Sequence, residues 1–396
     1  MDIVIVGAGI GGLTAAASLL QRGHRVRVVE QSQALGEIGA GLQLSANAVK
    51  VLFSLGLKEA LDVDGVKPTA LECRRFDSGE LLFRVPQAKA HLAQYGADFY
   101  QIHRADLHAA LARKVLTLDP KALHLGARVT GIQEDKSSVT LGFANSDPMR
   151  AELVIGADGI KSIVREHVHG AEDKPTFTGQ VAWRLLIPIE RIPRELRTDL
   201  LGTMWCGYGK YALMYYLRGG KLLNFVGSSA SDWNEESWTA RRPWQELDRD
   251  YAGWHPIVRA VIDAADRDQC FCWALNSRTP DPIWSTDRLT MLGDAVHAML
   301  PNMAQGAAMA IEDAAVLARA LDLDLPLAEA LRCYEQHRAP RTSRVVEASA
   351  VATTFFQFKS ETTDEMRQYF QDNKYASREW LYSYDALGVD LVSTLT

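Results

Sequence analysis

The first thirty residues alternate between apolar and mixed segments in a strand–helix–strand order. "DIVIVGAG" is a continuous apolar run, typical of a parallel strand that is covered on both faces. "GLTAAASLLQRG" places small and apolar residues at helical spacing and ends at Gly23, where a helix C-cap is expected. "RVRVVE" then alternates as a second strand would. Residues 2–30 therefore predict a βαβ unit.

Two later segments repeat the change from an apolar strand to a glycine turn. "ELVIGADG" is one, and "LTMLGDAVHAMLPNMAQGAAMAIEDAAVLARAL" adds a loop and a long alanine-rich helix that is predicted to begin near Gln305. Between residues 171 and 280, "QVAWRLLIPI" and "KYALMYYLRGGKLLNFVGSS" are rich in aromatic and β-branched residues, as antiparallel strands are. The "RGGK" turn at 218–221 predicts a hairpin between two of them. Beyond about residue 350 the pattern becomes helical and polar.

Together these patterns predict an α/β protein with a Rossmann-like nucleotide-binding domain, an interleaved substrate domain of mixed or antiparallel sheet, and C-terminal helices. The nucleotide-binding domain is expected to be discontinuous, over residues 1–70, 98–170 and 281–345. The sheet domain is assigned to 71–97 and 171–280, and the helical segment to 346–396.

Composition narrows the function classes. The chain has 396 residues, with 49 acidic and 43 basic side chains and a formal charge of −6, which argues against a nucleic-acid or anionic membrane surface. Five cysteines without zinc or redox spacing indicate reduced thiols, and ten histidines show no metal-ligand motif. Asp2 and the interrupting glycines do not fit a signal peptide or membrane span, so a cytoplasmic location without a metal is expected.

The G-x-G-x-x-G spacing of Gly7, Gly9 and Gly12 is the first chemical motif. The first glycine permits the tight turn, the second lets backbone approach a pyrophosphate, and the third lets the helix lie against the strand. The N-terminus of the helix then faces the phosphates with unpaired N–H groups. Glu30 ends the second strand, where an acid binds a ribose hydroxyl and repels a 2′-phosphate. This pattern fits both NAD and FAD, which share an ADP moiety.

Two further stretches resemble the FAD-binding group A aromatic hydroxylases, the family of para-hydroxybenzoate, salicylate and 3-hydroxybenzoate hydroxylases. "VIGADGIKSIVR" is similar to the DG motif of this family, and "LTMLGDAVHAMLPNMAQGAAMAIEDA" to its GD motif. "IHRADLHAAL" resembles the segment whose arginine contacts the flavin's ribitol and phosphate region, and "GARVTGI" one that meets the adenine through backbone. The match extends over essentially the whole chain.

The resemblance implies a bound FAD and assigns roles to matching positions. Asp158 lies in the turn near the pyrophosphate and the nicotinamide path, Asp294 binds the ribitol, and Pro301 and Gly306 shape the loop beside the flavin ring. The expected FAD-binding residues are Gly7, Gly9, Gly12, Glu30, Gln31, Gln43, Arg104, Val129, Asp158, Gly159, Asp294, Pro301 and Gly306. The positive end of the helix at Gly306 would stabilise negative charge on a reduced flavin.

The resemblance also implies the chemistry. NADH or NADPH binds transiently and reduces the flavin, O₂ adds to give a C4a-hydroperoxide, and one oxygen atom passes to an electron-rich ring. Tyr211 and Tyr215 fall where relatives place the acceptor of the substrate proton, on the strand face that also carries Leu213. A tyrosine titrates near 10, so it would relay a proton rather than hold one. Two core tyrosines of a sheet are the alternative interpretation.

The compact length and the tail "REWLYSYDA" favour a catabolic hydroxylase of a single-ring aromatic carboxylate, a hydroxybenzoate such as salicylate or 3-hydroxybenzoate. A hydroxypyridine carboxylate of the 6-hydroxynicotinate type is the alternative substrate. Enzymes that act on 6-hydroxynicotinate carry histidines at the two positions where this chain has Gln43 and Asn302, which makes this substrate less favoured. His297 is interpreted as structural, and Arg184 either fixes a flavin or a carboxylate or serves in a salt bridge.

Three rivals remain: a halogenase, a non-hydroxylating flavin oxidoreductase and a ligand-sensing flavoprotein. For the halogenase, "WRLLIP" is one tryptophan short of the WxWxIP motif. The expected partners are the aromatic substrate, O₂ and NAD(P)H, without nucleic acid or membrane, in a monomer or homodimer.

Overall fold

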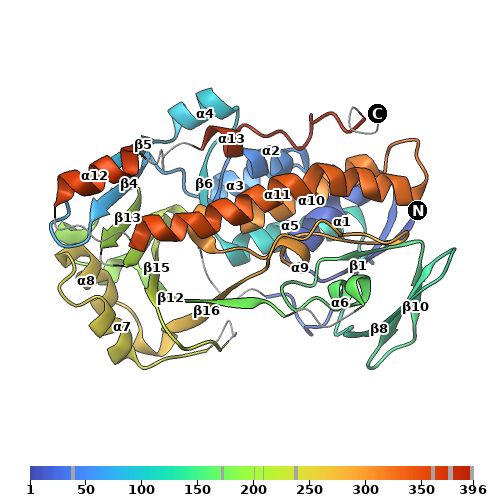
Figure 1. Cartoon of the computed structure of the whole chain (residues 1–396), viewed down its shortest axis with the longest axis horizontal. Coiled ribbons are helices and arrows are strands. Elements are labelled where there is room, and N and C mark those ends of the chain that lie inside the picture. Colours follow the sequence, from blue (N-terminus) through green and yellow to red (C-terminus); the bar gives the residue numbers. More distant parts are fainter. Residues whose placement is uncertain are drawn as a thin grey trace.

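The computed structural model of the chain describes residues 1–36, 41–170, 174–199, 201–207, 209–235, 240–357, 362–372 and 378–392. Two large sheets divide it (Figure 1). The first is parallel, in the order β17-β11-β1-β2-β7. Its strands are β1 (Asp2–Val6), β2 (Arg25–Glu30), β7 (Leu123–Leu125), β11 (Leu153–Gly156) and β17 (Leu289–Met291). This sheet confirms the predicted Rossmann-like unit, with all three glycine turns at the ends of adjacent strands.

Small residues let three helices pack closely against the parallel sheet. They are α1 (Ile10–Leu20), α5 (Arg104–Leu118) and α10 (Gly306–Ala320). α1 contacts both of the others, and a Cβ at Gly11 would come within 3.1 Å of the Cβ of Ala310. The alanine-rich sequences are thus explained by helix–helix approach. A three-stranded antiparallel sheet lies beside this layer, formed by β8 (Val129–Glu134), β9 (Val139–Phe143) and β10 (Met149–Ala151).

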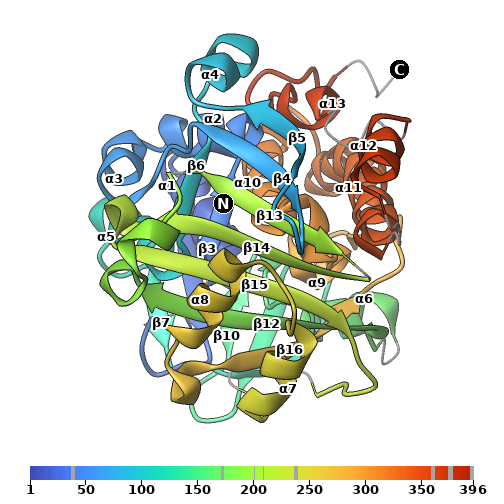
Figure 2. The ribbon, with the colours of Figure 1, turned by 90° about the vertical axis from the view of Figure 1, so that its left-hand side faces the viewer.

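The second large sheet has seven strands in the order β16-β12-β15-β14-β13-β4-β5, antiparallel except where β13 meets β4. They are β4 (Ala70–Arg75), β5 (Leu81–Pro86), β12 (Thr176–Pro188), β13 (Gly202–Gly207), β14 (Lys210–Leu217), β15 (Leu222–Ala230) and β16 (Phe271–Ser277). The predicted hairpin joins β14 to β15, with Gly219 and Gly220 at φ 65° and 88°. Figure 2 shows α7 (Trp244–Asp250) and α8 (Pro256–Asp263) in front of this sheet.

The two faces of β14 enter different cores. Ala212, Met214 and Tyr216 pack with α7 and α8 in a core of their own, whereas Tyr211 belongs to the larger core that is continuous with the parallel sheet. The predicted division of β14 into two faces is therefore confirmed. The face that carries Tyr211, Leu213 and Tyr215 is turned toward the nucleotide-binding layer.

The remaining elements connect the layers. β3 (Gly41–Leu44) pairs with β6 (Tyr100–His103), and α11 (Leu327–Gln357) runs along the molecule (Figure 1). The other helices are α2 (Ala46–Ser54), α3 (Lys58–Asp64), α4 (Lys89–Tyr95), α6 (Ile163–His169), α9 (Asp294–His297), α12 (Thr363–Asp372) and α13 (Glu379–Tyr382). The boundary predicted between residues 345 and 346 falls inside α11, which is one continuous helix. The domain limits drawn from the sequence stay a prediction. All five cysteines are buried, and none of them forms a disulfide.

Candidate active site

The glycine loop after β1 forms an open cradle of backbone. Gly7 has φ 103°, and a Cβ on Gly12 would lie 2.0 Å from the carbonyl oxygen of Gly7, so both positions require glycine. A Cβ on Gly9 would meet no atom within 4 Å, and α1 begins there without a side-chain cap. Uncapped N–H groups beside open space fit a pyrophosphate, and the contacts of Gly7, Gly9 and Gly12 with FAD stay predictions.

Glu30 fastens this loop to the end of β2. Its carboxylate accepts hydrogen bonds from the backbone N–H groups of Ala8 and Ser32, each at 2.9 Å. From α5, Nε2 of His108 lies 2.7 Å from the carbonyl oxygen of Ala8. Glu30 therefore positions the cradle, a role that sequence reasoning did not assign. Its predicted contact with a ribose, and that of the exposed Gln31 beside it, stay predictions.

The DG turn is built by Asp158. Its carboxylate accepts from the Ser162 hydroxyl at 2.6 Å and from the Ile163 amide at 2.8 Å, which caps α6. Burial raises the pKa of Asp158, against the effect of these hydrogen bonds. Gly159, at φ 76°, then carries the chain out of the turn. Asp158 holds the turn in shape, and what it contacts beyond the chain stays a prediction.

The GD turn presents a carboxylate to solvent. Asp294 is exposed while the residues around it are buried, and it follows Gly293 at φ 61°. The 3₁₀ turn Pro301–Met303 comes next, and α10 begins at Gly306 without a side-chain cap. A Cβ on Gly306 would meet nothing closer than 4.0 Å. This second uncapped N-terminus fits the negative flavin edge for which the sequence predicted it.

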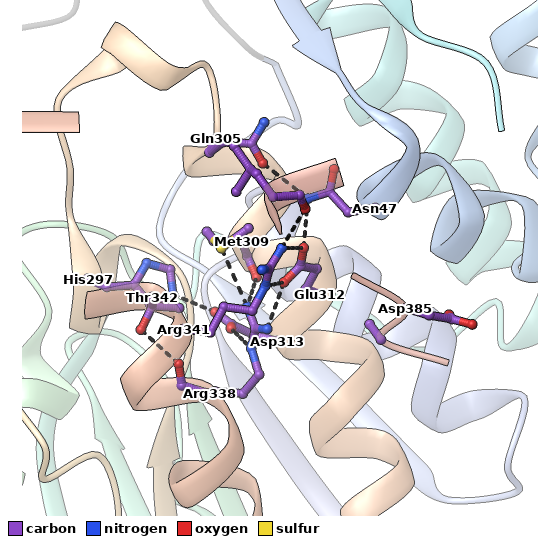
Figure 3. A network of polar contacts seen from close by, with 12 residues as sticks. Asn47, His297, Gln305, Met309, Glu312, Asp313, Arg338, Arg341, Thr342 and Asp385 are labelled. Carbon is purple, nitrogen blue, oxygen red and sulfur yellow. Dashed lines mark hydrogen bonds and ion pairs between the residues drawn. The ribbon is translucent and has the colours of Figure 1, made fainter. Parts of the chain in front are cut away.

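A buried ionic network holds the GD turn from behind (Figure 3). Asp313 accepts hydrogen bonds from the backbone N–H of Gly293 at 3.0 Å and from Nε of Arg338 at 2.7 Å, and it lies 2.6 Å from Nε2 of His297. Burial alone would raise the pKa of Asp313, but His297 and Arg338 outweigh it and lower the pKa to about 2. The structural interpretation of His297 agrees with this placement.

The same network reaches the strand–helix connection between β3 and α2. Glu312, fully buried, accepts from Arg338 at 2.6 Å, from Arg341 at 2.7 Å and from the side chain of Asn47 at 2.6 Å. Asn47 also donates to Gln305, the residue before α10. Sequence analysis missed this network because hydrogen-bonded partners within it, such as Asn47 and Glu312, are 265 positions apart, and only the acid pair in "AIEDA" signalled it.

The predicted proton-handling tyrosines lie on the inner face of β14. The Tyr211 hydroxyl donates to Oδ1 of Asn302 at 3.1 Å, and burial raises the pKa of Tyr211 to about 12, with Arg184 opposing the shift. Burial also raises the pKa of Tyr215, whose ring packs so closely on Gly41 that a Cβ there would lie 2.4 Å from it. Tyr211 is thus hydrogen-bonded to the loop that is predicted to lie beside the flavin, whereas Tyr215 packs against β3.

Arg184 brings a cation to this face. It pairs with Val226 of β15, opposite Leu213, so its side chain is on the same side as both tyrosines. Its guanidinium carbon lies 4.3 Å from the centroid of the Trp273 ring, and burial lowers the pKa of Arg184 while Tyr215 and Tyr211 raise it. Within the described residues its buried Nε has no hydrogen-bond partner. No carboxylate pairs with it there, which disfavours the salt-bridge alternative.

A cavity of about 140 Å³ opens between this face and the loop after α9. Its walls include Gln43, Leu213, Met204, Pro301, Asn302 and Met303. Further lining comes from β5, α4 and the C-terminal segment, at Phe83, Val85, Gln87, His91, Tyr95, Arg378 and Tyr382. Gln43, predicted to contact FAD, therefore lines this cavity. Gln87, His91 and Arg378 were not predicted, since no motif joins positions so far apart.

The remaining predicted contacts occupy the expected elements. Arg104 is the first residue of α5, and Val129 is the first of β8. Their contacts with the cofactor stay predictions. No group of three or more potential metal ligands occurs among the described residues, and no helix within them is long and apolar enough to span a membrane.

Two uncapped helix N-termini at the edge of a parallel sheet, beside a cavity under an aromatic sheet, define a flavin-binding oxidoreductase of the Rossmann-like class. A family model described as an FAD binding domain matches residues 1–349. The chain is 37% identical over 354 residues to the 6-hydroxynicotinate 3-monooxygenase of Bordetella bronchiseptica, covering 88% of this chain and 90% of that protein. It is 34% identical over 347 residues to the 3-hydroxybenzoate 6-hydroxylase of Klebsiella oxytoca, covering 87% and 86%.

Among solved structures, Klebsiella pneumoniae HpxO complexed with FAD and uric acid has a TM-score of 0.83 at 28% identity, over 96% of this chain and 95% of that chain. The chain therefore belongs to the FAD-binding domain family and is an FAD-dependent aromatic hydroxylase of group A. The predicted FAD, α/β fold and monooxygenase class are confirmed, and the halogenase and ligand-sensing interpretations fall away.

Proposed function

We propose that this enzyme hydroxylates a single-ring aromatic carboxylate, a hydroxybenzoate such as salicylate or 3-hydroxybenzoate, in a catabolic role. The observation that carries the proposal is the cavity beside Pro301 and Met303, whose volume is about 140 Å³. A cavity of roughly 150 Å³ holds one benzene ring in a protein core. Leu213, Met204 and Phe83 supply apolar walls, so a single ring fits by size and by chemistry.

FAD, when bound, would supply the redox chemistry through which NAD(P)H activates O₂, and O₂ would be the source of the transferred oxygen atom. The residues of this chain position the ring, exclude water and handle the proton of its hydroxyl group. Tyr211 is proposed to hydrogen-bond the hydroxyl group of the ring and to relay its proton rather than hold it, because a phenol with a pKa of about 12 does not hold negative charge at neutral pH. The amide of Asn302, which accepts a hydrogen bond from Tyr211, orients that hydroxyl and is not itself the acceptor of the proton. Arg184 supplies positive charge on the same face, which stabilises a phenolate.

A hydroxypyridine carboxylate is the second candidate. The identity to the Bordetella enzyme favours it, and the amide side chains of Gln43 and Asn302, one lining the cavity and one bonded to Tyr211, offer a ring nitrogen both donors and acceptors. The histidines that 6-hydroxynicotinate enzymes are expected to carry at these positions are absent from the sequence, which favours the benzoates.

The experiment is a panel of salicylate, 3-hydroxybenzoate, 4-hydroxybenzoate, anthranilate and 6-hydroxynicotinate, with NADH and NADPH. Substrate-stimulated nucleotide oxidation, O₂ uptake and product identification are measured together. One hydroxylated product per nucleotide supports the proposal. If none of the five compounds stimulates nucleotide oxidation or yields a product, the single-ring assignment is overturned. Light scattering tests the proposed monomer or homodimer, and cell fractionation the proposed cytoplasmic location.

A further inference from the structure

A closed ring of three hydrogen bonds joins the start of α2 to the start of α10. The Ser45 hydroxyl donates to Oδ1 of Asn47 at 2.5 Å, Nδ2 of Asn47 donates to Oε1 of Gln305 at 3.1 Å, and Nε2 of Gln305 donates back to the Ser45 hydroxyl at 3.1 Å. All three side chains are buried, and Figure 3 shows the contact between Asn47 and Gln305. Ser45 is at the N-cap position of α2, but its hydroxyl does not cap that helix. The ring therefore uses a side chain that would ordinarily stabilise its own helix.

The ionic network behind this ring decides which way its two amides point. Nδ2 of Asn47 also donates to Oε1 of Glu312 at 2.6 Å. Glu312 forms ion pairs with two arginines of α11, so its carboxylate only accepts hydrogen bonds. Asn47 must therefore turn its nitrogen toward Glu312 and its oxygen toward Ser45. The orientation of the Gln305 amide follows, because its oxygen has to accept from Asn47. Asn47 is thus the residue through which the network fixes Gln305.

The residue before Gln305 has a strained backbone. Ala304 has φ 54° and ψ 37°, in the left-handed region that residues other than glycine rarely adopt. Such a conformation persists only where the surrounding structure holds it. On one side the N–H of Ala304 donates to the carbonyl oxygen of Pro301 at 2.9 Å, which closes the 3₁₀ turn. On the other side the ring holds Gln305, whose carbonyl oxygen accepts from the N–H of Met309 in α10 at 2.8 Å. The ring therefore stabilises a backbone conformation that alanine does not favour.

This strained residue lies between two surfaces that the reaction needs. Residues 301–304 line the cavity. α10 begins at Gly306, two residues after Ala304, and its uncapped N-terminus fits the negative edge of the flavin. A backbone rotation at Ala304 would move one surface relative to the other, and a misplacement of about 1 Å can slow an enzyme about 100-fold. The position of a bound ring relative to the flavin should therefore depend on the conformation of Ala304.

We propose that Asn47 is a positioning residue for the hydroxylation. Through Gln305 it holds the turn at 301–305 in the strained form that sets the cavity wall beside the N-terminus of α10. Asn47 acts through Gln305, because neither it nor Ser45 is among the described residues that line the cavity. The part of the inference that concerns the cavity rests on the proposed function. The part that concerns the flavin rests only on the binding of FAD.

The test measures the reduction potential of the bound FAD by equilibration with a reference dye, without substrate. In Asn47→Leu the turn should relax, and the N-terminus of α10 should stabilise the negative charge of the reduced flavin less. We expect the equilibrium constant for two-electron reduction to fall about 3- to 10-fold. This corresponds to a decrease of about 15 to 30 mV, since a tenfold change is about 30 mV for two electrons. With a substrate identified by the hydroxylation panel, the fraction of oxidised NAD(P)H that yields product should also fall.

Val49→Ala is the matched control, because Val49 is fully buried on the same helix as Asn47 and takes no part in the ring. It should lower the thermal stability by leaving a cavity and should leave the potential unchanged. Ser45→Ala opens the ring but keeps the contacts of Asn47 with Gln305 and Glu312. It should shift the potential in the same direction by less, and it supplies the measurement if Asn47→Leu does not fold or does not retain FAD.

A potential equal to that of wild type in the Asn47 and Ser45 variants that bind FAD overturns the inference. A shift in V49A as large as theirs overturns it as well, because the potential would then report only a loss of stability. If the potential shifts as expected but the hydroxylation panel yields no product, the proposed function fails and the role of Asn47 toward the flavin stands.

Discussion

Replacing Arg338 by methionine should destabilise the enzyme, because two buried carboxylates would each lose an ion-pair partner. Arg338 is fully buried and bridges Glu312 and Asp313, which are also fully buried. In the variant Glu312 keeps Arg341 and Asp313 keeps His297, so neither carboxylate loses every partner. Breaking a buried ion pair by removing one partner costs about 3–5 kcal/mol. We expect the free energy of unfolding at pH 7 to fall by that amount.

The lowered pKa of Asp313 gives the direction of the pH dependence. A decrease from its ordinary 3.8 to about 2 corresponds to roughly 2 kcal/mol in favour of the charged form. Because the folded pKa is below the unfolded one, this stabilisation is present above pH 4 and is lost as the pH falls from about 4 toward 2. Without Arg338 the pKa of Asp313 should rise toward its unfolded value. The free energy of unfolding of the variant should therefore decrease less than that of wild type as the pH falls from about 4 toward 2. The stabilities of the two proteins should converge in acid.

The assay is urea unfolding in excess FAD, followed by circular dichroism at pH 7 and at lower pH values. Arg332→Met is the control, since Arg332 is exposed on the same helix and its change should stay within about 0.5 kcal/mol. Arg341→Met, which leaves Arg338 in place, should cost less than R338M and serves if R338M does not fold. A loss below 1 kcal/mol for R338M, or a difference between the proteins that does not narrow in acid, would refute the reasoning.

Two further predictions concern the cofactor and the proton. Gly12→Ala should abolish tight FAD binding, because its Cβ would lie 2.0 Å from the carbonyl oxygen of Gly7, whereas Gly131→Ala, with no atom within 4 Å, should purify with full flavin absorbance. Equal flavin content in both would contradict the fit of this loop. Tyr211→Phe removes the hydroxyl that donates to Asn302 and should slow hydroxylation about 100-fold with substrate binding kept. An unchanged rate and unchanged coupling to product would remove Tyr211 from the catalytic residues.

The fold was predictable where local chemistry and tertiary structure agree. β1, α1 and β2 follow the apolar runs and glycines directly, and the Gly219–Gly220 turn specified the β14–β15 hairpin. The sequence of residues 171–280 suggested only strands, so α7 and α8 were missed. α7 is a short, mostly charged segment, and its helix is stabilised by packing Leu247 into the core beneath the sheet. That contact depends on strands distant in sequence.

The candidate site divides in the same way. Gly7, Gly12 and Asp158 were found from motifs because a phosphate-binding turn needs fixed residue types at fixed spacing. The cavity-lining residues Gln87 and His91 could not be predicted, since a wall of a cavity needs no fixed residue spacing and these positions meet the other walls only in the folded protein. The cofactor is bound by motifs of fixed sequence, so FAD could be predicted. The substrate is bound by cavity walls that follow no motif, so only its chemical class could be predicted.

Among the described residues, several buried polar atoms around the substrate face lack partners, as does Nδ1 of His297 in the ionic network. In the network of Figure 3, each buried carboxylate accepts hydrogen bonds from at least three groups. Around the substrate face, by contrast, the described residues Gln43, Gln87, His91, Arg184 and Asn224 each bury an atom without a partner. Leaving such atoms unsatisfied costs free energy of folding that a bound ring with a carboxylate and a hydroxyl would recover. Ligand binding should therefore stabilise this face more than the network behind it, and hydrogen exchange with and without benzoate should show protection in β3, α4 and β12 while α10 changes little.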